Sequence, residues 1–442
     1  MDIKLSDHFT YKKLLRFTVP SVIMLVFTSI YGVVDGFFVS NIVGKTPFAA
    51  VNFIMPFLMV LGAFGFMFGT GGGTLIARTL GEGKHEKANK QFSLFVYVSF
   101  AFAVLLAAVS IWKLPEIASF LGAEGKLLSD CVLYGRIILI ALPFYTLQFE
   151  FQMFFVTAEK PKLGLYMTIV SGAANMVLDA LFIVVFNWGL IGAAAATAVS
   201  QILGGLVPVI YFARPNKSLL RLTKTNFDKK ALLKACTNGS SELMSNISMS
   251  VVSMLYNVQL LKYAGENGIA AYGVLMYVNF TFVSAFIGYS VGSAPLFSFH
   301  FGAKNTDELK NLRKKSNAII GFCSVIMLIA SFLLAEPLSQ MFVGYDKELF
   351  DMTVRGFYIF SFSFLFAGFA IFGSGFFTAL NDGLTSAIIS FLRTLVFQIA
   401  AVLLLPLVLG LDGIWISVVA AEAAAVALTF LFIKLKKKKY HY

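Results

Sequence analysis

Six ionisable side chains lie within long apolar stretches of this chain, where a charge is costly unless it is paired or has a function. Five are carboxylic acids, which can take up a proton or bind a hard cation such as Na⁺. The sixth is an arginine, which can neutralise a carboxylate or bind an anion. They are Asp35, Glu150, Asp179, Glu242, Arg393 and Glu422.

Two of these acids fall at one depth in the N-terminal half. Asp35 lies six residues before the first stretch reaches the surface, and Asp179 lies eight residues before the turn at 187–189. Thr197 follows that turn by eight residues, so at about 1.5 Å per residue all three lie roughly 9–12 Å below one surface. Asn175 is one turn from Asp179, on the same helix face. We predict that these four side chains bind a proton or Na⁺; a buried hydrogen-bonded cluster without ion traffic is the alternative.

The remaining candidates lie elsewhere. Arg393 and Glu422 fall near mid-depth on consecutive stretches, which predicts a buried ion pair with either a structural role or a gating or substrate role. Glu150 either extends its carboxylate toward the surface or faces a cavity. Glu242 lies near the start of its stretch and is a further candidate for a cavity wall.

Composition identifies the class of protein. Of the 442 residues, 58% are hydrophobic and 13% charged, whereas a soluble domain has about 25% charged residues. This excludes a soluble enzyme, a disordered chain and a secreted disulfide scaffold. The three cysteines are far apart and indicate neither disulfides nor a zinc site, and no nucleophile, base or metal set is clustered.

Continuous apolar runs, each long enough for a membrane-spanning helix, predict an all-α polytopic membrane protein. The twelve predicted spans are 14–40, 48–78, 92–112, 130–157, 163–186, 190–213, 236–261, 269–299, 316–335, 349–379, 384–409 and 412–434.

Basic residues predict the orientation. The termini and the even-numbered loops carry 27 lysines and arginines, and the opposite side carries five. Both termini are therefore expected in the cytoplasm of a cell (inner) membrane protein. The net charge of +12 is then explained by an anionic lipid leaflet rather than by nucleic acid.

The chain repeats itself at an offset of 221 residues. Gly71 aligns with Gly292 and Gly192 with Gly413, without gaps across six spans. Residues 1–221 and 222–442 are therefore predicted to form two six-helix lobes related by a pseudo-two-fold axis, with a transport path between them.

The polar cluster is not repeated. Its members align with Tyr256, Val396, Ala400 and Val418. A structural role would more easily have survived in both halves, so the difference favours a function for the N-terminal cluster. Tyr256 is a further candidate for the cavity wall of the second half.

Two glycine-containing motifs do not indicate nucleotide binding. The segment 69–74 is glycine-rich but lies inside a span, where small residues favour close helix packing. Gly83-Lys84 is followed by His85 rather than by the Ser or Thr of a phosphate-binding loop.

The sequence resembles the multidrug and toxic compound extrusion (MATE) family, in particular its bacterial MepA-type branch, over essentially the whole chain. The similarity rests on the span that contains Pro20 and Asp35, on segment 71–83 and its counterpart 292–302 in the second half, and on segment 175–179.

The resemblance implies a V-shaped pair of six-helix lobes that exports cationic or amphipathic drugs and dyes in exchange for H⁺ or Na⁺, as a monomer without a cofactor. It places the cation on Asp35, Asn175, Asp179 and Thr197 and implies that span 1 bends at Pro20. A flippase for lipid-linked precursors is the nearest alternative, and a channel or membrane enzyme is more remote.

Overall fold

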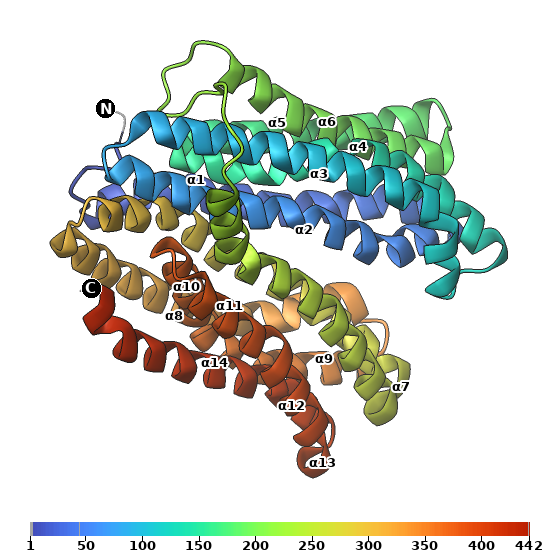
Figure 1. Ribbon diagram of the computed structural model, residues 1–442. Coiled ribbons are helices and arrows are strands. Elements are labelled where there is room, and N and C mark those ends of the chain that lie inside the picture. The colour runs from blue at the N-terminus through green and yellow to red at the C-terminus, as the bar shows by residue number, and fades with distance from the viewer. Residues whose placement is uncertain (1–2, 44, 441) are drawn as a thin grey trace.

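The computed structural model describes residues 3–43, 45–440 and 442, without the side chains of residues 31–37, 40, 41, 45, 46, 250 and 266 (Figure 1). All regular elements of this described part are helical, as predicted. The first six helices are α1 (Tyr11–Phe38), α2 (Lys45–Gly81), α3 (His85–Phe120), α4 (Gly125–Thr157), α5 (Pro161–Asp179) and α6 (Gly189–Ala213). The others are α7 (Lys229–Gly302), α8 (Thr306–Val343), α9 (Lys347–Phe360), α10 (Phe364–Ala379), α11 (Gly383–Phe391), α12 (Phe397–Leu404), α13 (Pro406–Leu409) and α14 (Leu411–Tyr440).

Eleven helices of the described part are long and apolar enough to cross a membrane. The predicted span 236–261 is not among them, because its first half carries polar residues such as Asn238, Ser241 and Glu242. It forms the first part of α7, and the predicted span 269–299 forms the second part.

A break at Gly265 separates the two parts of α7. Its backbone has φ 62° and ψ −152°, a conformation that glycine adopts without strain. Ala235 before the break and Phe299 after it both approach α2, at Gly71 and Gly81. The chain therefore reverses at Gly265 and crosses the molecule twice, as the prediction of two spans requires.

Several helices are longer than the apolar runs that predicted them. Helix α8 covers Thr306–Val343 where hydropathy gave 316–335. Hydropathy marks only the part that can lie in hydrocarbon, whereas a charged turn, such as the first turn of α8 with Asp307 and Glu308, continues the helix into water. Side-chain caps determine where three of the helices begin: Asn305 caps α8, Asp346 caps α9 and Asp382 caps α11.

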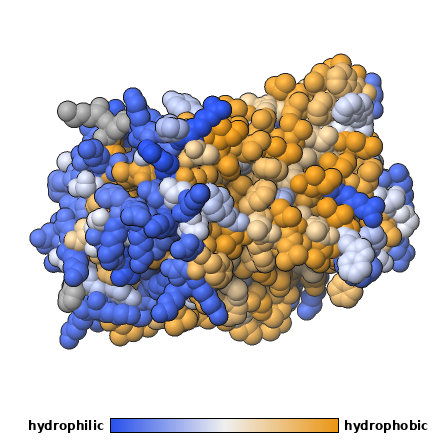
Figure 2. All heavy atoms as spheres, turned by 45° about the horizontal axis from the view of Figure 1, so that its top comes forward, coloured by the Kyte–Doolittle hydropathy of each residue, from blue (hydrophilic) through white to orange (hydrophobic). Residues whose placement is uncertain are grey.

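Helices α1–α6 form one lobe and α7–α14 form the other, and the two lobes spread apart from one end of the molecule toward the other (Figure 1). We call the end that holds residues 3–10, 436–440 and 442 the termini end. Figure 2 shows a broad hydrophobic band between this hydrophilic end and a thinner polar rim opposite. Such a band is typical of a protein that spans a bilayer.

The lobes meet where α1 and α2 pack against α7. Backbone lies against backbone at four points of this contact: a Cβ at Gly71 would lie 2.0 Å from the Ala235 carbonyl oxygen, and one at Gly81 would lie 2.0 Å from that of Phe299. Gly239 and Gly302 approach the backbone of α2 equally closely. We call these four residues the glycine seam; it confirms the packing role predicted for segment 69–74.

Alanine at Gly81 should force the lobes apart and lower the melting temperature of the purified protein, since overpacking typically costs about 1–3 kcal/mol. Gly273→Ala is the matched control, because a Cβ there meets nothing within 4 Å and alanine favours a helix. Equal melting temperatures for the two variants would show that the seam can relax.

Candidate cation site and charged cluster

The N-terminal polar cluster is built on α5 and α6, which lie side by side. Asn175 and Asp179 lie one turn apart on α5, and both are buried, at 2% and 0% exposure. The Asn175 side-chain amide donates to Thr197 Oγ1 at 3.4 Å. The structure therefore brings Asn175 and Thr197 together and places Asp179 directly beyond them.

Asp35 is carried by α1, which packs against α5. Its side chain lies outside the described residues, so the structure positions only its helix. The amide, hydroxyl and carboxylate oxygens of the other three members are all hard donors, of the kind that Na⁺ accepts, and Asp179 can alternatively carry a proton.

A π-helical segment, Ala180–Val185, begins directly after Asp179. The wider turn alters the direction of the side chains that follow, and such segments often occur at functional sites. Apolar periodicity alone gives no signal for a π-turn, so the sequence did not predict it.

Pro20 lies inside α1 and is buried. Its neighbour Ser21 is crossed by α7 at Gly288 and Gly292, where an added Cβ would lie 2.8 Å from the Ser21 carbonyl oxygen and 3.1 Å from its Cβ. The proline therefore lies at the crossing of the two lobes, where a bend in α1 would change the contact between them.

The predicted ion pair between Arg393 and Glu422 is present. Arg393 Nε lies 2.8 Å from Glu422 Oε2 and 3.1 Å from Oε1, and the side chains are 15% and 7% exposed. Arg393 lies on a second π-helical segment, Leu392–Val396. The pair therefore links α14 to the segment between α11 and α12.

Tyr256 is buried inside the C-terminal lobe rather than on a cavity wall. Its hydroxyl donates to Gln398 Oε1 at 2.8 Å, and its ring stacks on Tyr272 with centroids 5.4 Å apart. Glu242 is half-buried on α7. The sequence did not predict Gln398 or Tyr272 as partners, because their contacts join helices far apart along the chain.

Glu150 is wholly buried within the N-terminal lobe and accepts a hydrogen bond from Ser99 Oγ on α3 at 2.5 Å. Helix α4 packs mainly against α2, α3 and α6, and the Glu150 backbone lies against Gly69 of α2. The predicted alternative of a side chain that extends to the surface is wrong, since Glu150 is wholly buried, and the cavity-facing alternative stays a prediction.

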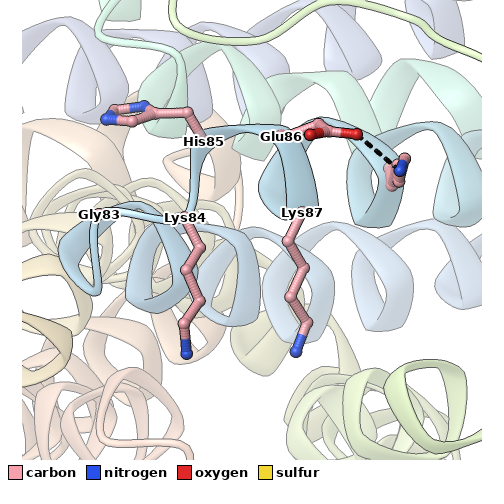
Figure 3. Close-up of a pocket in the computed structure, with 6 residues that line it drawn as sticks. Gly83, Lys84, His85, Glu86 and Lys87 are labelled. Carbon is pink, nitrogen blue, oxygen red and sulfur yellow. Dashed lines mark ion pairs between the residues drawn. The ribbon is translucent and has the colours of Figure 1, made fainter.

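In contrast to the buried Glu150, a surface hollow at the turn between α2 and α3 is lined by exposed charged side chains. Lys84 and Lys87 extend side by side from it, and Glu86 pairs with Lys90 at 2.7 Å (Figure 3). These side chains are largely exposed. The hollow is a solvated basic turn, in line with the rejection of a phosphate-binding loop at 83–85.

Truncating Arg393 should strand the Glu422 carboxylate in the lobe interior. We expect Arg393→Ala to lower the folded yield, since breaking a buried pair costs about 3–5 kcal/mol, and Arg393→Met with Glu422→Leu to recover it. Arg355→Ala is the control: Arg355 pairs with Asp412 at 2.5 Å but is 69% exposed, so its loss should matter little. Yield is read by size-exclusion chromatography, and normal yields for both Arg393→Ala and Glu422→Ala would exclude a structural role.

Comparison with known proteins agrees with this architecture. The family model MatE matches the chain twice, over residues 20–181 and again over residues 243–404. The multidrug export protein MepA of Staphylococcus haemolyticus is 28% identical over 365 residues, covering 81% of this chain and 80% of that protein. The MepA of Staphylococcus aureus strain MSSA476 is 25% identical over 417 residues, covering 93% and 91%.

Solved structures share the fold. A MATE protein crystallised with MaL6 superposes with a TM-score of 0.93 at 20% identity and covers 98% of both chains. An outward-facing multidrug resistance MATE transporter of the MOP superfamily superposes with a TM-score of 0.92 at 20% identity, covering 98% of this chain and 97% of that one. Since the family model matches most of the chain, this multi-pass membrane protein belongs to the MatE family, the MATE multidrug efflux transporters.

Proposed function

We propose that this protein is a secondary antiporter that exports amphipathic, often cationic, drugs and dyes in exchange for H⁺ or Na⁺. The observation that carries the proposal is the set of buried Asp179 and Asn175 with half-buried Thr197, which the other lobe does not repeat. The relatives named multidrug export proteins support drugs as the substrate class. Asp35, carried by the adjacent helix, is the proposed fourth member.

The proposed orientation places both termini in the cytoplasm of a cell membrane protein, because the termini and even-numbered loops carry most of the lysines and arginines. The lobes, residues 1–221 and 222–442, then meet on the cytoplasmic side and diverge toward the outside. Hydrogen bonds across the contact support this state: Asn238 donates to Thr74 Oγ1 at 2.8 Å, and Ser298 donates to the Thr74 carbonyl oxygen at 2.5 Å.

The N-terminal segment adds a second link between the lobes. The Leu5 amide donates to Glu159, on the turn between α4 and α5, at 2.5 Å, and the Phe9 amide donates to Glu308 at the start of α8 at 2.9 Å. A drug path between the lobes would be closed at this end as long as these bonds persist.

Exchange follows if the two ligands favour different lobe arrangements. A cation that binds one arrangement better and a drug that binds the other shift the same equilibrium in opposite directions. The N-terminal lobe would hold the cation, and its bending at Pro20 would change the contact with α7. Neither ligand needs to touch the other.

A flippase is a less suitable function for this site. A lipid-linked pyrophosphate requires unpaired positive charge in the path. Arg393, the buried cation between α11 and α12, is neutralised by Glu422 at 2.8 Å. This observation favours the drug antiporter.

Asparagine at Asp179 or at Asp35 keeps the side-chain shape and removes the charge. We expect both variants to reach the membrane and to lose dye efflux from liposomes driven by a pH or sodium gradient, whichever of the two drives the parent protein. Asn175→Ala and Thr197→Ala should weaken efflux less, because each removes one neutral ligand.

Tyr256→Phe is the matched control at the corresponding position of the other lobe. It removes one hydrogen bond, worth about 1 kcal/mol of stability, and should leave the gradient dependence of efflux unchanged. Parent-like efflux by both aspartate variants would overturn the proposed coupling site.

Orientation can be tested separately by labelling with an impermeant maleimide. Cysteine at Lys347, which begins α9 at the outer end, should react in whole cells, whereas cysteine at Lys224 or Lys310 should react only after the cells are opened. The parent chain, with its buried Cys131 and half-buried Cys236 and Cys323, gives the background. The reverse pattern would invert the molecule in the membrane.

A further inference from the structure

Two buried glutamines of α4 lie below the proposed cation site, toward the termini end. Gln148 and Gln152 are one turn apart, so both face the same side of the helix, and they are 6% and 3% exposed. Among the described residues, neither end of the Gln152 amide has a hydrogen-bond partner, and Gln148 Oε1 also has none. Buried amide groups without partners cost free energy, so their occurrence side by side calls for a ligand.

A small cavity lies directly against these amides. It lies between α4, α5 and α6, and the centre of a water-sized sphere can occupy about 10 Å³ of it. That is about the space that one water molecule requires. Its lining includes Gln148, Gln152, Thr168 and Phe151.

A column of hydrogen bonds joins the cavity to the proposed cation site. Asn175 donates to Thr197, and Ser200 donates to the Thr197 carbonyl oxygen at 2.8 Å. Ser171 in turn donates to the Ser200 carbonyl oxygen at 2.8 Å, and Gln148 donates to Ser171 at 3.4 Å. The two bonds at the ends of the column are the long ones, both 3.4 Å, so they are the easiest to open.

Glycine keeps room for the column. A Cβ at Gly204 of α6 would lie 2.6 Å from Gln148 Cδ, so only glycine lets this glutamine lie against α6. The column runs inside the N-terminal lobe and does not use the glycine seam or the space between the lobes.

We infer that this cavity is a water site and that the column above it lets the proposed cation site exchange water with the termini end while the lobes stay packed. Water both donates and accepts, so one molecule can bond to the Gln152 amide, to Gln148 Oε1 and to Thr168 Oγ1. The role of this path in transport rests on the proposed coupling role of Asp179. The presence of water in the cavity does not depend on that role.

Radiolytic hydroxyl-radical footprinting of the detergent-purified protein tests the water site, because bound water supplies radicals to the side chains beside it. Phe151 lines the cavity and is 1% exposed, and Phe377 is a control with 0% exposure in the hydrophobic core of the other lobe. We expect Phe151 to be modified several-fold faster than Phe377, and Gln152→Leu with Thr168→Val to remove the difference. Equal rates in the parent protein would overturn the proposal.

The role of the water site is tested by efflux from liposomes. Gln152→Leu keeps the approximate volume and removes an amide that has no protein partner, so it should fold normally. We expect several-fold slower gradient-driven efflux with unchanged dye affinity, and the same for Gly204→Ala. Gly273→Ala again serves as the control, since its site is open.

The two proposals fail in different ways. Parent-like efflux by Asp179→Asn would overturn the coupling site, whatever the footprint shows. Loss of efflux by Asp179→Asn together with parent-like efflux by Gln152→Leu would overturn the exchange path alone. An unreactive Phe151 would overturn the water site independently of both.

Discussion

Hydrocarbon offers no hydrogen-bond partner, and this constraint governs the whole molecule. Backbone groups are satisfied within long helices, and buried polar side chains must find partners within one lobe or across the contact between lobes. Glu150 bonds to Ser99, Arg393 to Glu422, and Tyr256 to Gln398. A cavity that lies against buried groups without a partner in the described part of the chain is therefore a place where a small polar ligand can bind.

The two lobes share a scaffold but differ in what they bury. The N-terminal lobe buries the Asp179 carboxylate and the Asn175 amide, whereas the C-terminal lobe holds an ion pair and a tyrosine that stacks on Tyr272. A pair whose charges cancel has little to gain from a cation, whereas a buried carboxylate can bind a proton or a cation. This difference makes the N-terminal lobe the better place for cation-driven movement.

Much of the fold could be predicted from the sequence, because hydropathy, basic loops and the internal repeat each report a global constraint. The helices, the two lobes and the Arg393–Glu422 pair follow from that. The buried position of Glu150 and the hydrogen bond from Tyr256 to Gln398 could not be predicted, since they depend on which helix covers which face. The π-segment after Asp179 leaves no trace in apolar periodicity, and the Asp35 side chain lies outside the described residues.

The glycine seam has a consequence for how the lobes separate. Backbone lies against backbone at Gly71 and Gly81, and because Gly81 is flanked by Leu80 and Glu82, a shift of one residue along α2 would bring a Cβ into that space. The seam therefore fits in one register only, and intermediate slid positions are strained. Packed surfaces of this kind behave as a switch with discrete positions rather than as a sliding joint, which keeps small solutes from leaking through a half-open contact.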